Sequence, residues 1–88
     1  MPDCRVLLTG FEPFGGWPGN PSADVVRRLS RDPSLRAQGL MTAILPVHRL
    51  RAPSELERLL RKREPDILVM TGLAAGREAI SVERLTVN

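Results

Sequence analysis

The chain has 88 residues, 42% of them hydrophobic, which is enough for one small globular unit or a piece of one, with a thin margin of stability. The formal net charge of +3 comes mostly from scattered arginines, and with two Phe, one Trp and no Tyr there is no basic patch interleaved with stacking aromatics, so we expect no nucleic-acid partner. The single cysteine, Cys4, excludes an internal disulfide and a cysteine-rich metal site.

Neither a signal peptide nor an apolar stretch long enough to cross a membrane is visible in the sequence. We therefore expect a cytoplasmic protein without a membrane partner, in keeping with the use of one cysteine.

The first half of the chain predicts a strand, a loop, a helix and a second strand. The apolar run at 4–9 predicts a buried strand that Gly10 stops, and the loop at 10–20 is rich in glycine and proline. Asn20 as N-cap and Pro21 in the first turn predict a helix that ends at 32–34. The strand at 40–45 follows. The inward stripe of the helix consists of Ser22, Val25, Val26 and Leu29.

The second half repeats the pattern. A connection that contains His48 leads to a helix expected at 53–62, which Glu64 and Pro65 end. The most continuously apolar run, at 66–71, predicts the third strand. Strand, helix, strand, helix, strand predicts an α/β fold: a βαβαβ unit with a parallel sheet flanked by helices, plus a C-terminal extended segment from Ile80.

In parallel sheets, ligands bind beyond the carboxyl ends of the strands. Glycines follow two of these ends, at Gly10 and Gly72, so the two loops should face one another. Neither loop has a phosphate-binding pattern, although the strand and helix layout leaves a nucleotide-binding module open. Phe11 and Phe14 either cap the sheet edge or form the wall of an apolar slot for a small ring, and the sequence leaves both interpretations open.

The closing segment carries one carboxylate, Glu83, among residues suited to burial. The apolar side of its alternation changes near Arg84, which predicts a bulge or an environment that is buried on both sides. A buried carboxylate needs a partner. Glu83 would either pair with Arg77 or Arg84, or orient a histidine as the third member of a catalytic triad.

Three motifs of the chain stand out: Gly-Phe-Glu-Pro-Phe-Gly-Gly at 10–16, Asn-Pro-Ser at 20–22, and Gly-Arg followed by Ile-Ser-x-Glu-Arg and Asn at 76–88. Together they resemble the N-terminal part of the pyroglutamyl-peptidase I family, also called pyrrolidone-carboxylate peptidase. The resemblance implies a cytoplasmic cysteine peptidase that removes N-terminal pyroglutamate from peptides, on an α/β/α fold. It also implies that no metal or cofactor is needed, and members of the family often form homo-oligomers.

The resemblance assigns roles to particular residues. Glu83 matches the acidic member of the Cys, His and acid triad, and Phe11 and Phe14 match the aromatic residues that hold the pyrrolidone ring. The loops would be shaped and held by Gly10, Gly72, Gly76 and Arg77.

Members of the family are more than twice this length, and their nucleophilic cysteine and its histidine lie beyond the position of Asn88. Residues 1–88 are therefore expected to form a single incomplete domain that is inactive alone. Cys4 matches no catalytic position, and we expect a buried core thiol; His48 does not match the catalytic histidine and is expected in an exposed loop. The alternative is a non-catalytic remnant that binds a partner or a complementing C-terminal half.

Overall fold

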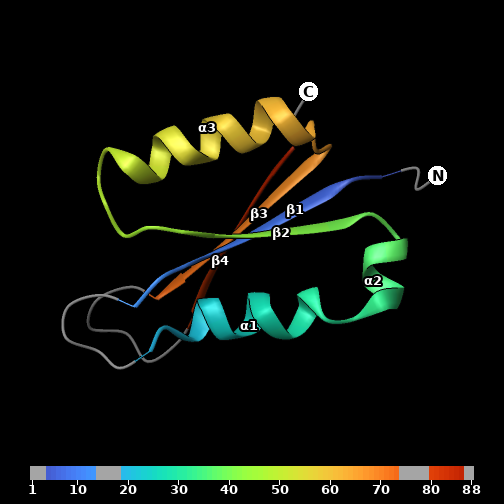
Figure 1. Cartoon of the computed structure of the whole chain (residues 1–88), viewed down its shortest axis with the longest axis horizontal. Helices are drawn as coiled ribbons and strands as arrows, with labels where there is room; N and C mark the ends of the chain where they lie inside the picture. The colour runs from blue at the N-terminus through green and yellow to red at the C-terminus, as the bar shows by residue number, and fades with distance from the viewer. Residues whose placement is uncertain (1–3, 14–18, 74–79, 87–88) are drawn as a thin grey trace.

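The computed structural model describes residues 4–13, 19–73 and 80–86, with the main chain alone for residues 73 and 80–86. The described elements form one sheet with helices on both faces (Figure 1). In chain order they are β1 (Val6–Phe11), α1 (Pro21–Ser30), α2 (Pro33–Ala37), β2 (Leu40–Leu45), α3 (Arg51–Arg63), β3 (Ile67–Leu73) and β4 (Ile80–Thr86).

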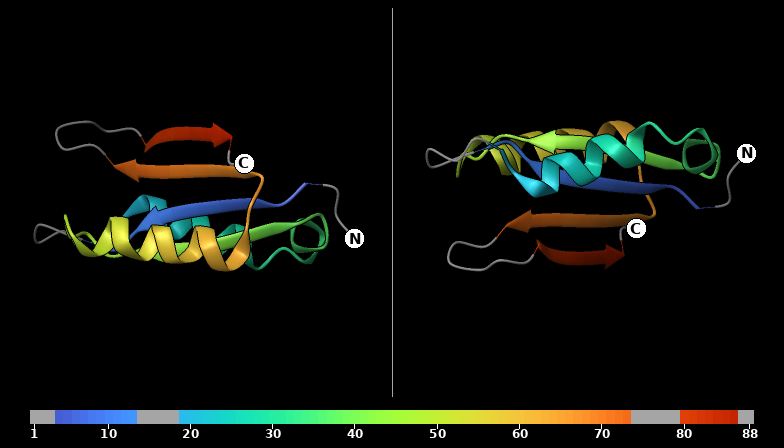
Figure 2. Two further views of the ribbon diagram at one scale, coloured as in Figure 1. Left: turned by 90° about the horizontal axis from the view of Figure 1, so that it is seen from above. Right: turned by 90° about the horizontal axis from the view of Figure 1, so that it is seen from below.

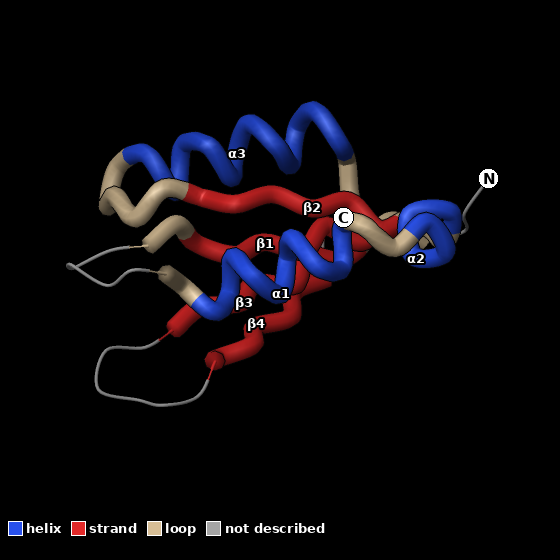
Figure 3. Tube along the Cα trace, turned by 60° about the horizontal axis from the view of Figure 1, so that its bottom comes forward, coloured by secondary structure: helices blue, strands red, loops and turns tan. Residues whose placement is uncertain are grey.

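The strand order is β2-β1-β3-β4, as the trace in Figure 3 shows. The strands β2, β1 and β3 are parallel, and β4 is antiparallel to β3. The predicted α/β fold with a parallel sheet is confirmed, and the extended C-terminal segment forms an antiparallel fourth strand.

The two long helices cover opposite faces of the sheet, because the chain moves from β1 to β2 in one direction and from β2 back across β1 to β3 in the other (Figure 1). A buried apolar cluster lies under α3, and its buried members are Leu7, Leu45, Leu59 and Leu68. Figure 2 shows β4 as the strand farthest from α3.

The predicted start of α1 is confirmed. Asn20 is the N-cap, its side-chain oxygen accepts the main-chain N–H of Ser22, and Pro21 occupies the first turn. The predicted inward stripe is wrong at Leu29, which is 37% exposed, because the buried stripe of α1 stops before its last turn. Its buried residues are Ser22, Ala23 and Val26.

The boundaries of the first strand differ from the prediction at both ends. β1 begins at Val6, so Cys4 lies outside the sheet and is exposed, and the expected buried thiol is wrong. Gly10 does not stop the strand, because β2 continues to pair with it and with Phe11. In the same way β3 runs through Gly72, where β4 supplies the pairing partner.

The connections between the elements also hold details that the sequence pattern did not predict. α2 was not expected; Asp32 caps it by accepting the N–H of Ser34 at 2.9 Å. α3 begins at Arg51, earlier than predicted, because the Nδ1 atom of His48 accepts the N–H groups of Leu50 and Arg51 at 3.2 and 3.0 Å.

The C-terminal half of the sheet is regular. Glu64 ends α3 with a positive φ of 47°, at the position where the sequence predicted the break. The pairing of β4 with β3 runs without interruption from Ile80 to Thr86. The sequence predicted either a bulge near Arg84 or burial on both sides of the strand. The continuous pairing shows that there is no bulge in this strand.

Candidate functional site at the carboxyl ends of β1 and β3

The candidate site lies where β1 and β3 separate. Pairing between these strands ends at Thr9 with Met70, whereas pairing between β1 and β2 continues to Phe11 with Leu45. The crossovers on the two sides of β1 run over opposite faces, so the gap between β1 and β3 is the topological switch point, where ligands bind in open parallel sheets.

Of the two segments predicted to face each other, the structure describes Gly10 and Gly72, which lie near the ends of the neighbouring strands β1 and β3. The parts of these segments at 14–18 and 74–79 lie outside the described residues. The hydroxyl of Thr71 donates a hydrogen bond to the main-chain oxygen of Thr9 at 2.8 Å. A Cβ atom built on Gly72 would lie 3.6 Å from Cδ2 of Phe11, so the aromatic ring packs over the backbone of Gly72.

An apolar pocket of about 220 Å³ opens beside this ring. It lies between the carboxyl ends of the strands and the first turns of α3, and every side chain that lines it is apolar. Such a pocket suits a small ring with apolar faces. The lining residues are Phe11, Leu45, Ala52, Pro53, Leu56 and Met70.

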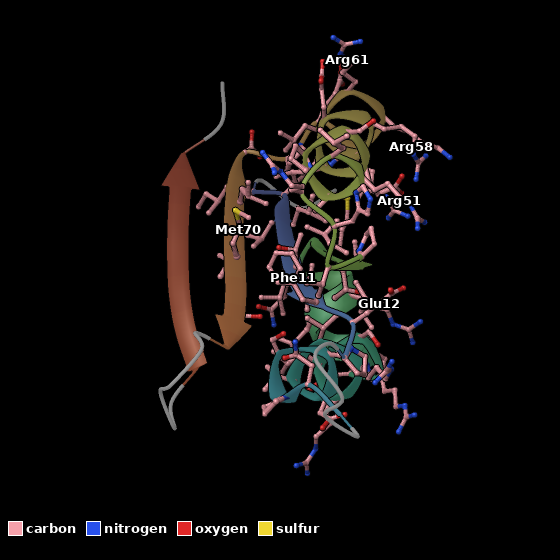
Figure 4. The ribbon with its side chains drawn as sticks, turned by 90° about the vertical axis from the view of Figure 1, so that its left-hand side faces the viewer. Phe11, Glu12, Arg51, Arg58, Arg61 and Met70 are labelled. Atoms are coloured by element: carbon pink, nitrogen blue, oxygen red, sulfur yellow. The ribbon has the colours of Figure 1, made fainter. Side chains whose placement is uncertain are left out.

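The sequence left open whether Phe11 caps the sheet edge or forms the wall of an apolar slot, and its position fits both. The ring is half-buried and packs against the apolar cluster beneath α3, and it also forms part of the pocket wall. Figure 4 labels Phe11 and Met70 on the neighbouring strands β1 and β3. Phe14 lies outside the described residues.

The strand register places Glu83 near the pocket. Glu83 is paired with Met70 of β3, and Met70 in turn is paired with Thr9 of β1, so the three residues form one row across the sheet. Arg84 is paired with Val69, and Arg77 and Gly76 lie outside the described residues. Pairing of Glu83 with either arginine therefore stays a prediction.

Cys4 and His48 are not brought to the pocket as a catalytic pair. Cys4 precedes β1, at the end of the strand opposite to Phe11. His48 lies in the connection that follows β2, is exposed as predicted, and uses Nδ1 as an acceptor for the start of α3. Neither residue lines the pocket.

Charged side chains gather on the outer surface of α3, away from the pocket. Arg58 and Arg61 form ion pairs with Glu55 and Glu57, and both arginines point away from the sheet (Figure 4). The hydrogen bond from Arg58 lowers the pKa of the Glu55 carboxyl, with a Coulombic contribution from Arg58 and Arg51. A larger hollow of about 600 Å³ lies among these side chains, and a single helix supplies all of its walls.

Across the described ranges, no group of three His, Cys, Asp or Glu side chains is arranged to hold a metal ion. Within the same ranges, no helix is both long enough and apolar enough to cross a membrane.

Most of the pocket wall was missed by reasoning from the sequence. Leu45 and Met70 lie in predicted strands, Pro53 and Leu56 lie in the predicted helix, and Ala52 lies in the connection before it. An apolar side chain in a strand or on an inward helix face has the same sequence pattern in a pocket wall as in a core. Among the residues of the wall, only Phe11 was predicted to line a pocket, because it is an aromatic residue close to glycines.

Comparisons with known proteins identify relatives of this chain. A sequence profile of the pyroglutamyl peptidase family matches residues 4–88. The pyrrolidone-carboxylate peptidase of Thermosipho melanesiensis is 40% identical over 84 residues, which are 96% of this chain and 41% of the relative. The enzyme of the same name from Pyrococcus furiosus is 44% identical over 84 residues, 96% of this chain and 40% of the relative.

A solved structure shows the same arrangement of the chain. The crystal structure of pyrrolidone carboxyl peptidase from Pyrococcus furiosus superimposes with a TM-score of 0.73 and 39% identity, over 85% of this chain and 36% of that one. The chain thus spans about two fifths of the length of the relatives that it matches.

Proposed function

Because the chain belongs to the pyroglutamyl peptidase family, we propose that residues 1–88 are the N-terminal portion of a pyroglutamyl-peptidase I domain. The proposed activity is the removal of an N-terminal pyroglutamyl residue from peptides by a cysteine nucleophile. One observation carries the proposal: the apolar pocket at Phe11 lies one strand away from the position of Glu83, the carboxylate of the closing motif.

The pocket is the proposed binding site for the pyrrolidone ring. This ring is small and has apolar faces, and the half-buried ring of Phe11 offers an aromatic surface for stacking beside Met70. Phe14, which lies outside the described residues, is proposed to help hold the substrate ring, as its match to the family motif implies. Gly72 supports this arrangement, because a larger side chain there would contact Phe11.

Glu83 is the proposed orienting member of the triad. In this chemistry a histidine takes the proton of the cysteine thiol, and the thiolate attacks the carbonyl carbon of the pyroglutamyl residue. The peptide amine leaves with a proton from the histidine, and water then hydrolyses the acyl-enzyme. Glu83 accepts a hydrogen bond from the other ring nitrogen, which selects the tautomer and stabilises the imidazolium.

The nucleophile and the base are proposed to come from sequence that these 88 residues do not contain. The sequence holds one cysteine and one histidine. Cys4 lies at the wrong end of β1, and the Nδ1 atom of His48 is engaged at the start of α3. The coverage of 41% of a relative leaves room for both missing groups.

A direct experiment is to incubate the purified chain with a pyroglutamyl arylamide in the presence of a reducing agent and to measure release of the arylamine. We expect no release above the buffer rate, and the same result for the C4S and H48N variants. Thiol-dependent release by the unchanged chain that is lost in C4S would contradict the proposed source of the nucleophile.

A second candidate function is a non-catalytic chain that binds a complementing C-terminal half. The position of β4 favours it, because β4 has a described strand on one edge only and lies farthest from α3 (Figure 2). An unpaired strand edge is a ready site for another strand. Sedimentation equilibrium that shows a folded, stable monomer at high concentration would count against this function.

A further inference from the structure

A short chain of hydrogen bonds connects the start of α1 to the main chain of Phe11. The side-chain oxygen of Asn20 accepts the N–H of Ser22 at 3.0 Å and its hydroxyl at 2.8 Å. The hydroxyl oxygen of Ser22 accepts the main-chain N–H of Phe11 at 3.0 Å, and the Asn20 amide donates to the main-chain oxygen of Glu12 at 3.2 Å. Both side chains are buried, with Asn20 2% and Ser22 0% exposed.

This chain of bonds replaces strand pairing at the point where pairing stops. Successive N–H groups of a strand point alternately to its two neighbours, and the N–H of Glu12 donates to Leu45 of β2. The N–H of Phe11 therefore points to the side of β3, whose pairing with β1 has already ended at Thr9. The Ser22 hydroxyl takes the place of the missing strand partner.

Gly10 permits this contact. A Cβ atom at Gly10 would lie 2.6 Å from the main-chain oxygen of Ser22, closer than real Cβ atoms come to backbone atoms. The first turn of α1 thus rests directly on β1, one residue before Phe11. On the opposite face of the sheet, the ring of Phe11 packs over Gly72 and forms part of the pocket wall.

We infer that Ser22 and Asn20 are positioning residues that set the placement of Phe11 and thereby the affinity of the pocket for the pyrrolidone ring. The inference rests on the proposed function, because it assumes that the pocket at Phe11 binds this ring. Ser22 acts through the backbone of Phe11 and does not itself line the pocket. Asn20 acts through Ser22 and through the carbonyl of Glu12.

The alternative role of both residues is helix capping alone, and the chain offers a matched control. Asp32 caps α2 as Asn20 caps α1, and Ser34 occupies the same place after its cap as Ser22 does. S22A and S34A each keep the capped N–H and remove only a hydroxyl. The hydroxyl of Ser34 is bonded to Gln38 on the surface, whereas that of Ser22 holds Phe11.

The test is a titration of the ¹⁵N-labelled chain with 2-pyrrolidone, followed by the amide shifts of Phe11 and Met70, together with amide hydrogen exchange at Phe11. We expect S22A to raise the Kd about tenfold, the effect of losing one hydrogen bond, and to speed exchange at Phe11. S22T, which restores the hydroxyl, should return both values towards those of the unchanged chain. S34A should leave both unchanged.

S22C keeps the volume with a weaker acceptor, and it gives the same test with a smaller shift if S22A does not fold. Equal Kd values for S22A and the unchanged chain overturn the positioning role and leave the proposed function intact. If the unchanged chain shows no shifts at Phe11 with 2-pyrrolidone, the proposed function fails and the role in ring binding fails with it. If amide hydrogen exchange at Phe11 is as fast in the unchanged chain as in S22A, the hydrogen bond from the N–H of Phe11 to Ser22 does not protect this amide, and the positioning role is overturned.

Discussion

The hydroxyl of Thr71 donates to the main-chain oxygen of Thr9 at 2.8 Å and joins β3 to β1 one residue beyond Met70, the last residue of β3 that pairs with β1. The two residues are 62 positions apart in the sequence, and both are buried. The bond therefore holds together the two strand ends that frame the candidate site. The only side-chain group that it requires is the hydroxyl of Thr71, because its acceptor is a main-chain oxygen.

The first prediction compares the two threonines. T71V removes the donor and leaves the buried oxygen of Thr9 with one partner fewer, so the free energy of unfolding should fall by about 1 kcal/mol. Within the described residues the hydroxyl of Thr9 has no partner, so T9V should keep or raise stability. Urea denaturation of both variants measures the difference, and a larger loss in T9V than in T71V would contradict the assignment.

The second prediction concerns the close approach of α1 to β1. G10A forces a Cβ against the Ser22 carbonyl and should lower the free energy of unfolding by about 1–3 kcal/mol, the usual cost of overpacking. G19A is the matched control, because a Cβ there meets no atom within 4 Å, and it should change stability by less than about 0.5 kcal/mol. Thermal unfolding checks both, and equal effects of the two substitutions would refute the contact.

The third prediction tests the role of Glu83. A hybrid of residues 1–88 with the following part of the Pyrococcus furiosus relative should release the arylamine from a pyroglutamyl arylamide. E83Q in this hybrid should lower kcat roughly 10⁴-fold with a small change in KM, because loss of an orienting carboxylate leaves the histidine in the wrong tautomer. E57Q on the outer surface of α3 is the control and should not alter kcat. An E83Q hybrid with unchanged kcat would exclude Glu83 from the triad.

The fourth prediction follows from the lowered pKa of Glu55. Its hydrogen bond with Arg58 is present in the folded state, so the folded-state pKa lies below the ordinary value of 4.5. The pair therefore adds stability above that value, and the contribution disappears as the pH falls through the folded-state pKa. E55Q should be slightly less stable than the unchanged chain at neutral pH and equal to it in acid. Melting temperatures that differ by the same amount at both pH values would contradict this linkage.

Much of the fold could be predicted because its signals are local. Asn20 before Pro21 marks a helix start, Glu64 before Pro65 marks a helix end, and unbroken apolar runs mark strands buried on both faces. The errors also have local causes. Gly10 was read as a strand end because glycine often breaks strands, but here the space beside it is filled by the backbone of α1.

The sequence by itself determined the alternation of strands and helices, the capping residues and the motifs by which Phe11 and Glu83 were singled out. Only the tertiary structure decided that β3 lies beside β1, that Met70 joins the pocket, and that Ser22 holds Phe11. The physical reason is the range of the interactions. Caps and propensities act over a few residues, whereas strand order and register depend on how the helices and strands bury their apolar faces together across the whole chain.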